Sequence, residues 1–444
     1  MLNNKYNNSN LMIFTIIGII IILIGILNFK KGFYLFLFYK LVLVTNITVI
    51  ALPGIPLLTL DVFMTMMFFC LYYRSRKKIQ LEQQPFPYKQ PFLLIVFSYF
   101  LSTVFAYVGF VSAFSQFIGQ AICEFAFAWL MWKVIDKDDI TYLIKGFTFM
   151  LLLSCIYGFY EKLFQNNPIV EYEMSMMSDS DRAIDFLVED DLNRGYRVQS
   201  FFEHAIGGGI NWGMFAVFAF SMLWVYRIAI TQKNKFSLLF TAILCIPCIF
   251  FANNRGAIVF FFIALLSLVN LKDTKFYFRI IMAVALLLLL APLFSDYTNN
   301  IMSLFDSKAQ EKVGGSNAEM RFEQLAAAIK LMSQSPILGL GYKFMNVMNT
   351  SLVSALLGLE SMWFRILTQF GMLGVVANLY LAYYSLIKIP KLYKSRPLFF
   401  LSLAYWVTAS LTSVPGMKMY FYYFVLIVFI KMSDFYTYNK YKQS

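Results

Sequence analysis

The sequence predicts an all-α integral membrane protein, a multi-pass bundle of about 12–13 transmembrane helices with two large outer loops. Three observations support this fold class. Hydrophobic residues make up 60% of the 444 residues and charged residues only 14%, and a soluble domain of that composition would have too little polar surface to cover itself. The apolar residues form runs of about 20, the length that crosses a bilayer as a helix. Basic residues gather in short loops between these runs.

The predicted spans follow one another through a single polytopic domain, residues 1–444. The first run lacks a basic segment ahead of it and a small-residue cleavage site, so we expect a retained helix rather than a cleaved signal. Residues 53–56 (Pro-Gly-Ile-Pro) separate the second run from the third, which form either a tight hairpin or one broken unit. The spans are expected near residues 11–28, 33–52, 55–73, 91–110, 114–133, 140–160, 207–229, 236–252, 256–270, 279–294, 358–387, 397–412 and 416–432.

The basic loops predict the orientation of the chain in the membrane. Clusters of lysine and arginine in cytoplasmic loops are typical of membrane proteins. Such clusters lie at residues 74–89, 227–235, 272–279 and 388–396. Alternation of the spans then places residues 161–206 and residues 295–357 outside, as a first and a second outer loop. The second outer loop is expected to contain a helix near 317–334, with alanine-rich helix formers that end at Ser335-Pro336.

Several classes of function are disfavoured by the composition. The net charge of +13 does not indicate nucleic-acid binding, because the basic residues lie where membrane topology requires them. The five cysteines all lie inside apolar runs and predict small core residues rather than disulfides, and the Cys245-x-x-Cys248 spacing falls within a span. The outer loops hold a single histidine and no cysteine, so neither a metal site nor a cofactor is predicted.

Two arginines are candidates for binding an anion at the outer face. Arg255 stands where one predicted span ends and the next begins, and an arginine tucked between spans is costly unless it serves an anionic partner or snorkels to the interface. Arg321 falls in the first turn of the loop helix, where a cation opposes the helix dipole unless an anion compensates. That anion is either a ligand or the neighbouring Glu319 or Glu323. Two guanidinium groups together bind a pyrophosphate with forked, charge-assisted hydrogen bonds and need no metal.

A carboxylate and a histidine complete the set of candidates. Glu360 begins the span after the second outer loop, where it serves as a general base or forms an ion pair with an outer arginine. Arg365 lies about 140° further around a helix, so a direct pair with Glu360 is disfavoured and substrate binding is expected. Arg197 and His204, the only histidine, end the first outer loop. His204 is either a structural histidine or a site residue.

These residues resemble the motifs of the O-antigen ligase and O-antigen polymerase family of bacterial envelope glycosyltransferases. Residues 253–257 (Asn-Asn-Arg-Gly-Ala) look like the family's Arg-Gly-Ala turn. Arg321 followed by residues 336–341 (Pro-Ile-Leu-Gly-Leu-Gly) resembles its loop-helix motif. Glu360-Ser361, nine residues and then Gly371-x-x-Gly374 have the spacing of its signature at the end of the large loop, and Arg197 with His204 resembles a weaker stretch ahead of these. Gly371 and Gly374 themselves are expected to allow close helix packing.

The resemblance implies a function and a site. Ligases of the family place a histidine where this chain has Glu360, and the carboxylate is similar to the polymerase branch. A polyprenyl-diphosphate-linked oligosaccharide would bind with its diphosphate on Arg255 and Arg321, while Glu360 removes a proton from the sugar hydroxyl of a second lipid-linked unit. Arg197, His204 and Arg365 would bind the substrate. The product would be O-antigen, capsule or exopolysaccharide.

The resemblance also implies a location and leaves alternatives. The protein would lie in the bacterial cytoplasmic (inner) membrane with its active site facing outward, and its partners would be the lipid-linked glycan, the bilayer and a chain-length regulator protein. One alternative is a ligase that moves the finished glycan to a lipid or protein acceptor. The other is a flippase or transporter, for which repeat symmetry and charges in the middle of spans would be expected.

Overall fold

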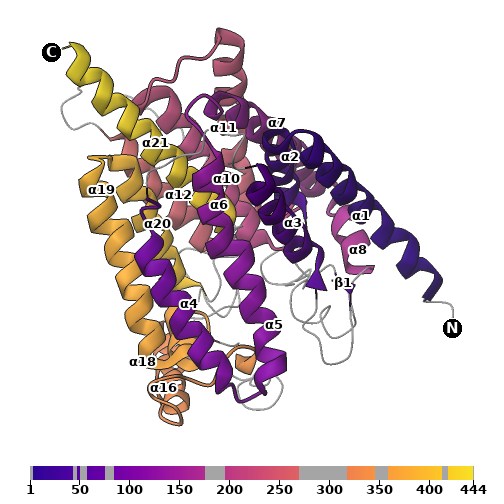
Figure 1. The fold of residues 1–444 in the computed structure, drawn as a ribbon, viewed down its shortest axis with the longest axis vertical. Helices are drawn as coiled ribbons and strands as arrows, with labels where there is room; N and C mark the ends of the chain where they lie inside the picture. The colour runs from indigo at the N-terminus through magenta and orange to yellow at the C-terminus, as the bar shows by residue number, and fades with distance from the viewer. Residues whose placement is uncertain are drawn as a thin grey trace.

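The computed structural model describes residues 4–43, 48–50, 58–75, 85–175, 196–269, 318–345, 359–412 and 419–443. In these ranges the regular structure is helical apart from one short two-stranded ribbon (Figure 1). The predicted span near 279–294 lies outside the described residues, as does the acidic part of the first outer loop at 176–195.

The first part of the chain forms the helices drawn in indigo to magenta in Figure 1. A π-helical turn at Ala121–Ala126 joins α5 to α6 into one continuous rod. The elements are α1 (Asn4–Leu27), α2 (Phe29–Val42), β1 (Thr48–Ile50), β2 (Leu58–Thr59), α3 (Leu60–Ser75), α4 (Lys89–Val104), α5 (Phe110–Gln120), α6 (Phe127–Val134), α7 (Ile140–Phe164) and α8 (Pro168–Ser175).

The second part continues the bundle. Side chains that accept a hydrogen bond from the first turn start α11, α12, α18 and α20, each from an Asn, Ser or Thr directly before the helix. The elements are α10 (Ala205–Phe220), α11 (Gln232–Phe251), α12 (Arg255–Leu265), α16 (Ala318–Met332), α18 (Met362–Tyr383), α19 (Ile389–Leu392), α20 (Arg396–Leu411) and α21 (Met419–Gln443). Further turns at Ser221–Val225, Leu266–Leu268 and Tyr384–Lys388 extend α10, α12 and α18.

The predicted fold class is confirmed. Within the described ranges, 5 helical rods are long and apolar enough to cross a membrane, and four shorter apolar helices accompany them. The long rods are Phe110–Val134, Ile140–Phe164, Ala205–Val225, Gln232–Phe251 and Met362–Leu392. The shorter ones are Ile13–Leu27, Lys89–Val104, Arg255–Leu268 and Met419–Ser433. The full number of spans stays a prediction.

The expected span over residues 33–52 is wrong in its second half. Helix α2 ends at Val42, and β1 pairs antiparallel with β2, Thr48 opposite Thr59. Residues 44–50 (Val-Thr-Asn-Ile-Thr-Val-Ile) are rich in β-branched side chains, which favour an extended backbone over a helix. The two expected spans around residues 53–56 are therefore shorter helices joined through a small ribbon.

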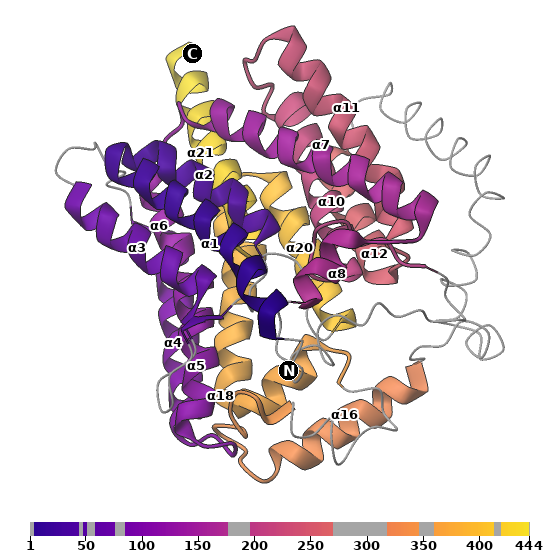
Figure 2. The same cartoon turned by 90° about the vertical axis from the view of Figure 1, so that its right-hand side faces the viewer.

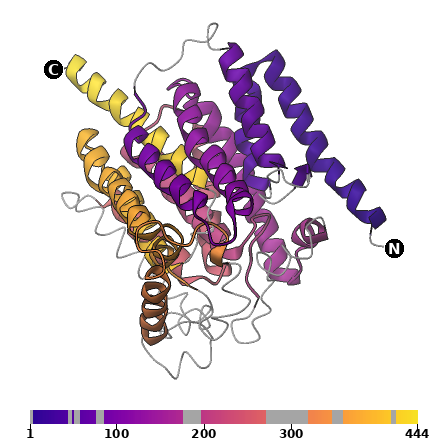
Figure 3. The ribbon, with the colours of Figure 1, turned by 60° about the horizontal axis from the view of Figure 1, so that its bottom comes forward.

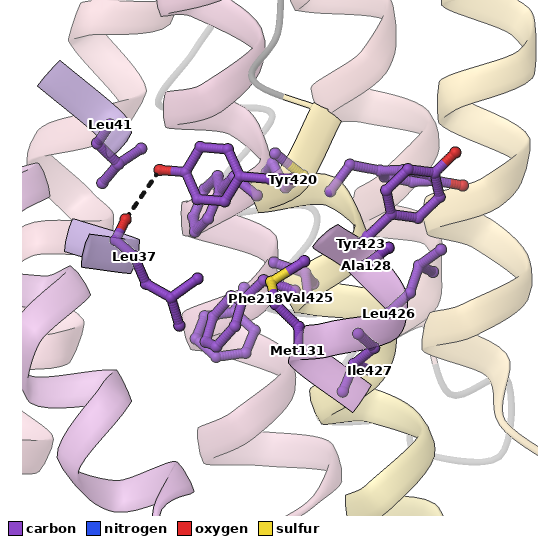
Figure 4. Close-up of a cluster of buried hydrophobic side chains, with 14 of the residues drawn as sticks. Leu37, Leu41, Ala128, Met131, Phe218, Tyr420, Tyr423, Val425, Leu426 and Ile427 are labelled. Atoms are coloured by element: carbon purple, nitrogen blue, oxygen red, sulfur yellow. Dashed lines mark hydrogen bonds between the residues drawn. The ribbon is translucent and has the colours of Figure 1, made fainter. Parts of the chain in front are cut away.

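Helices α10 and α21 form the centre of the bundle. Every residue from Tyr420 to Ile430 is buried, as is every residue from Gly207 to Phe220. Burial on all sides explains why these two stretches are apolar almost all round. In Figure 4 side chains of α2, α6 and α10 surround α21, and the Tyr420 hydroxyl donates to the Leu37 carbonyl at 3.1 Å. A Cβ atom on Gly209 would lie 2.7 Å from Ala257 Cβ, so the absence of a side chain at Gly209 lets α10 and α12 pack closely.

One buried ion pair lies inside the bundle. Lys40, near the end of α2, pairs with Asp61, in the first turn of α3, and both residues are only 5% exposed. The ammonium group also lies over the rings of Phe127 and Tyr420. The pair also places each charge at a helix end where the helix dipole favours it.

The two ends of the bundle differ in chemistry. At one end Lys30 contacts Asp139 at 2.9 Å, and the Tyr226 hydroxyl bridges Ser395 and Ser433. The basic clusters at 227–235 and 388–396 also lie at this end. At the other end lie the termini of α11, α12, α18 and α20 together with α16, which runs across the lower edge of the bundle in Figure 2.

Candidate functional site

Four helix ends meet where the candidate residues lie, and Figure 3 turns this end toward the viewer. The start of α18 is joined to the end of α20 by a hydrogen bond from the Met362 N–H to the Thr412 carbonyl, 2.9 Å. The end of α20 packs on the start of α12, where the Thr408 hydroxyl donates to the Gly256 carbonyl at 3.4 Å. Through Thr408 and Thr412, the end of α20 therefore connects the Arg255 turn with the start of α18.

Arg321 and Glu360 form an ion pair at this junction. The Arg321 Nη2 atom lies 3.4 Å from Glu360 Oε2, and the two side chains are 23% and 31% exposed. The same Nη2 donates to the Leu411 carbonyl at 2.9 Å, one of the carbonyls that the end of α20 leaves without a helical partner. The anion near Arg321 is thus Glu360 rather than a neighbour on its own helix.

The Gln324 side chain holds the backbone of Glu360 in place, a role that was not predicted from the sequence. Its Oε1 accepts the Glu360 N–H at 3.0 Å, and the residue is fully buried. Because Gln324 follows Arg321 by three positions, both side chains leave the same face of α16. A polar residue at that spacing within an alanine-rich helix was the available signal.

The two glycine motifs interlock with each other. Helix α18 is interrupted at Gly371, where φ is 58° and ψ −160°. The carbonyls of Thr368 and Gln369 accept the N–H groups of Leu340 and Gly341 at 2.9 and 2.8 Å. In return the N–H groups of residues 372 and 373 donate to the carbonyls of residues 336 and 337 at 2.9 and 3.1 Å. We call this contact between residues 335–341 and residues 368–373 the clasp.

The clasp replaces helical hydrogen bonds one for one. In an unbroken helix the carbonyls of residues 368 and 369 would accept the N–H groups of residues 372 and 373. The loop supplies a substitute partner for each of these four groups, so all four keep a hydrogen bond across the break. A Cβ atom on Gly339 would lie 2.4 Å from the Gln369 carbonyl carbon, and one on Gly371 would lie 2.6 Å from the Ile337 oxygen.

The expectation for Gly371 is corrected by the clasp. Gly371 serves a backbone break that admits a loop, not the packing of two helices. The loop follows α16 directly, so the clasp fixes the end of α16 against α18 and thereby holds Arg321 at Glu360. The Ser102 hydroxyl also donates to the Gln369 carbonyl at 2.6 Å, which ties α4 to the same point.

Arg255 opens α12 at a tight turn. The preceding Asn253 has a φ of 45°, a left-handed conformation that asparagine tolerates better than most residues. The Asn254 side chain accepts the Ala257 N–H at 3.1 Å and caps the helix. Arg255 is therefore held at the first position of a helix, partly exposed, at the same end of the bundle as Arg321.

Arg197 lies on a short segment that is anchored on both sides. The Val198 N–H donates to the Phe251 carbonyl at the end of α11, 3.0 Å, four residues ahead of Arg255. The Glu161 carboxylate, at the end of α7, accepts the N–H groups of Gln199 and Ser200 at 3.1 and 2.6 Å. The sequence analysis missed Glu161, although an acid within the last turn of an apolar span was visible.

His204 caps α10 and is neutral. Its Nδ1 accepts the Ile206 N–H at 3.0 Å, so the proton of the neutral ring lies on Nε2, which remains a donor. Burial, together with the positive charge of Arg197, lowers the pKa of His204 from 6.5 to about 4. The histidine thus has a structural role at the helix start, and its Nε2 side keeps a hydrogen to donate.

Arg365 follows Glu360 by five residues on α18. It lies in the first turn of α18, partly exposed, with its N–H donating to the Ser361 carbonyl at 3.2 Å. The structure brings Arg321 to Glu360 and places Arg255, Arg197 and His204 at helix ends of the same face. The roles assigned to these residues stay predictions.

The arrangement offers a carboxylate and several guanidinium groups at the end of a membrane bundle. Among the residues that the structure describes, no group of three or more histidine, cysteine, aspartate or glutamate side chains could hold a metal ion. Arg321 and the partly exposed carboxylate of Glu360 lie together at this end, and Arg255 lies at the same end.

Comparison with known families finds a match in the second half of the chain. Residues 240–379 match the family model described as O-antigen ligase. The matched segment contains Arg255, Arg321, Glu360 and both sides of the clasp, while Arg197 and His204 precede it. No curated protein matches the chain. The match confirms the resemblance over residues 240–379, where the chain is similar to the O-antigen ligase family.

Proposed function

We propose that the protein polymerises lipid-linked oligosaccharide repeat units. It would transfer a glycan from polyprenyl diphosphate to a sugar hydroxyl of another lipid-linked unit, at the outer face of the bacterial cytoplasmic membrane. The observation that supports this best is the half-buried Glu360 carboxylate beside Arg321, 3.4 Å away, within a segment of the O-antigen ligase family.

In the proposed reaction Glu360 takes the proton of the acceptor hydroxyl. The hydroxyl oxygen forms a bond to the anomeric carbon while the bond from that carbon to the diphosphate oxygen breaks. The electron pair of the broken bond leaves with polyprenyl diphosphate, and a single displacement inverts the anomeric centre. Glu360 afterwards releases the proton to water.

Arg321 and Arg255 would stabilise the charge that develops on the leaving group. Guanidinium groups suit this task because they present paired N–H donors to phosphate oxygens and stay charged at any physiological pH. Arg321 is already held by the Leu411 carbonyl, so part of its orientation is established before the donor binds. Arg197, His204 and Arg365 would contact the donor or the glycan.

The basic end of the bundle supports the proposed orientation. The clusters at 227–235 and 388–396 are expected in the cytoplasm, and Glu360 and the arginines at the opposite end would then lie on the outer side. A chain-length regulator protein is part of the proposal as a partner, because a polymerase of this kind makes products whose length must be set.

The test compares lipid-linked glycans in the native host. Wild type, a deletion and Glu360→Gln are compared by size distribution, with Glu323→Gln, an exposed acid on the same helix as Arg321, as the matched control. Collapse from long chains to single repeat units in the deletion and in Glu360→Gln, but not in the control, supports the polymerase. A normal ladder in Glu360→Gln with a defective deletion would remove Glu360 from the reaction.

A ligase is the second candidate, and the description of the matching family favours it. A ligase would use the same donor and the same arginines but pass the finished glycan to a lipid or protein. Long lipid-linked chains that accumulate without reaching their acceptor in the deletion strain would establish it. Intact single units that remain on the cytoplasmic side would instead indicate a flippase.

A further inference from the structure

We infer that Glu161 is a positioning residue of the donor site, which holds residues 196–200 so that Arg197 faces the diphosphate. The inference rests on the proposed function, because it takes a polyprenyl diphosphate as the ligand. It concerns a residue on α7, well before the matched family segment at 240–379.

Three donors from a single segment converge on the Glu161 side chain. Oε1 accepts the Gln199 N–H at 3.1 Å and the Tyr196 hydroxyl at 3.2 Å, and Oε2 accepts the Ser200 N–H at 2.6 Å. Glu161 is 1% exposed, and a buried carboxylate is costly unless such bonds satisfy it. The Glu161 side chain therefore fixes the conformation of residues 196–200.

The far end of the segment is locked by further contacts. Ser200 has a φ of 57°, a conformation that a residue with a side chain adopts only when its surroundings impose it. Its hydroxyl donates to the Ser154 carbonyl at 2.9 Å, and its own carbonyl accepts the Asn167 amide at 2.7 Å. Trp212 donates to the Ser154 hydroxyl at 2.8 Å, which adds α10 to the same network.

Arg197 is the residue that this scaffold presents. Its neighbours on both sides point into the protein: Tyr196 reaches Glu161, and Val198 is fully buried. Arg197 itself is partly exposed, and its charge acts on His204. The hydrogen bond from the Val198 N–H to the Phe251 carbonyl holds this arginine at a fixed distance from the Arg255 turn.

The position of a guanidinium group matters because forked binding of a phosphate depends on direction as well as charge. Changing Glu161 to glutamine replaces one acceptor oxygen with an NH₂ group that faces an N–H or O–H donor. The segment would then lose at least one hydrogen bond and shift, and Arg197 with it. The charge of Arg197 and the residues that touch the acceptor sugar would be unaltered.

The experiment measures binding of undecaprenyl diphosphate to the full chain in lipid nanodiscs. Wild type, Glu161→Gln, Arg197→Gln and the double variant form a thermodynamic cycle. We expect Glu161→Gln to weaken binding about tenfold, and to weaken it much less when Arg197 is already glutamine. In steady-state assays with lipid-linked donor, the same variant should raise KM for the donor and leave kcat nearly unchanged.

Two controls separate positioning from general damage. Glu171→Gln alters an exposed acid on α8 and should bind as wild type does. Tyr196→Phe removes only the hydroxyl contact to Glu161 and should weaken diphosphate binding less than Glu161→Gln does. It takes the place of Glu161→Gln if that variant does not fold. Hydrogen exchange of the Gln199 and Ser200 amides reports on the segment without any ligand and should speed up in Glu161→Gln.

Some outcomes would overturn the inference. Unchanged exchange of the two amides in Glu161→Gln would show that the carboxylate does not hold the segment. A tenfold loss that persists in the Arg197→Gln background would show that Glu161 acts elsewhere. Failure of the proposed function is a separate result. If wild-type protein binds the diphosphate and the two substitutions are coupled as expected, but the protein joins no glycans, the positioning role of Glu161 stands and the polymerase assignment is wrong.

Discussion

Two carboxylates at the same end of the bundle have opposite surroundings. Glu161 is 1% exposed and accepts three hydrogen bonds from residues 196–200. The Glu360 side chain is 31% exposed, and its recorded ion-pair contact with Arg321 is long, 3.4 Å. Both acids stand next to an apolar helix in the sequence, so only their contacts tell them apart.

This difference in surroundings indicates which of the two acids can act as a general base. A carboxylate whose oxygens are occupied by buried N–H and O–H donors cannot accept a proton without losing them, so Glu161 stabilises structure. An incoming hydroxyl can reach the partly exposed carboxylate of Glu360, which is the geometry that general-base catalysis requires. The regions also differ in support, because Glu161 holds its segment directly, while Glu360 depends on α16 and the clasp.

The largest effect is expected at Glu360. In an assay with purified protein and lipid-linked donor, Glu360→Gln should lower kcat by about 100-fold or more, because general-base catalysis is lost, and should leave the midpoint of thermal unfolding unchanged. Glu161→Gln should do the reverse, lowering the unfolding midpoint and sparing kcat. Equal kcat losses in both variants would break the comparison.

The clasp gives the next effect. Gly339→Ala would place a Cβ 2.4 Å from the Gln369 carbonyl carbon at a φ of 70°, which should cost about 2 kcal/mol or more in stability. Because the clasp holds α16, turnover should fall along with stability. Gly119→Ala is the matched control, since its nearest neighbour is 4.0 Å away and alanine favours a helix. Denaturation midpoints measure the stability and initial rates measure the turnover. A wild-type rate in Gly339→Ala would show that turnover does not depend on the clasp.

Arg321 should show an intermediate effect. Arg321→Lys keeps the charge but loses the planar guanidinium, whose Nη2 contacts both Glu360 and the Leu411 carbonyl. Because lysine cannot present paired N–H donors to a phosphate, kcat/KM for the lipid-linked donor should fall about tenfold. Lys330→Gln, at an exposed position of the same helix, should have no effect. A lysine variant as active as wild type would mean that charge alone suffices at this position.

The smallest effect concerns His204 and pH. Its pKa is lowered to about 4 in the folded protein, so the unfolded chain binds the proton first as the pH falls. The stability that the neutral histidine contributes is complete above pH 6.5 and is lost between about 6.5 and 4. His204→Asn retains a helix cap and does not titrate, so its unfolding midpoint should fall less than that of wild type between pH 7.5 and 5. Parallel curves would contradict this.

Much of the fold followed from composition and pattern. Apolar runs predicted α7, α10, α11 and α18 within a few residues, because crossing a bilayer imposes both length and apolarity. The run at 33–52 failed because apolarity does not distinguish a helix from β-branched strand residues. Motif order predicted that Arg255, Arg321 and Glu360 matter, but their contacts depend on chain segments far apart in the sequence.

The sequence by itself determined the membrane class, the helix-forming runs and the chemical groups offered at the loop–helix junctions. These are local properties: hydrophobicity, helix length, capping residues and charge belong to a segment wherever it lies. Only the tertiary structure decided that Arg321 meets Glu360 and that residues 335–341 enter the break in α18. It also decided that Glu161 holds the segment of Arg197. Those outcomes depend on hydrogen bonds between distant backbone groups, which leave no periodic mark in the chain.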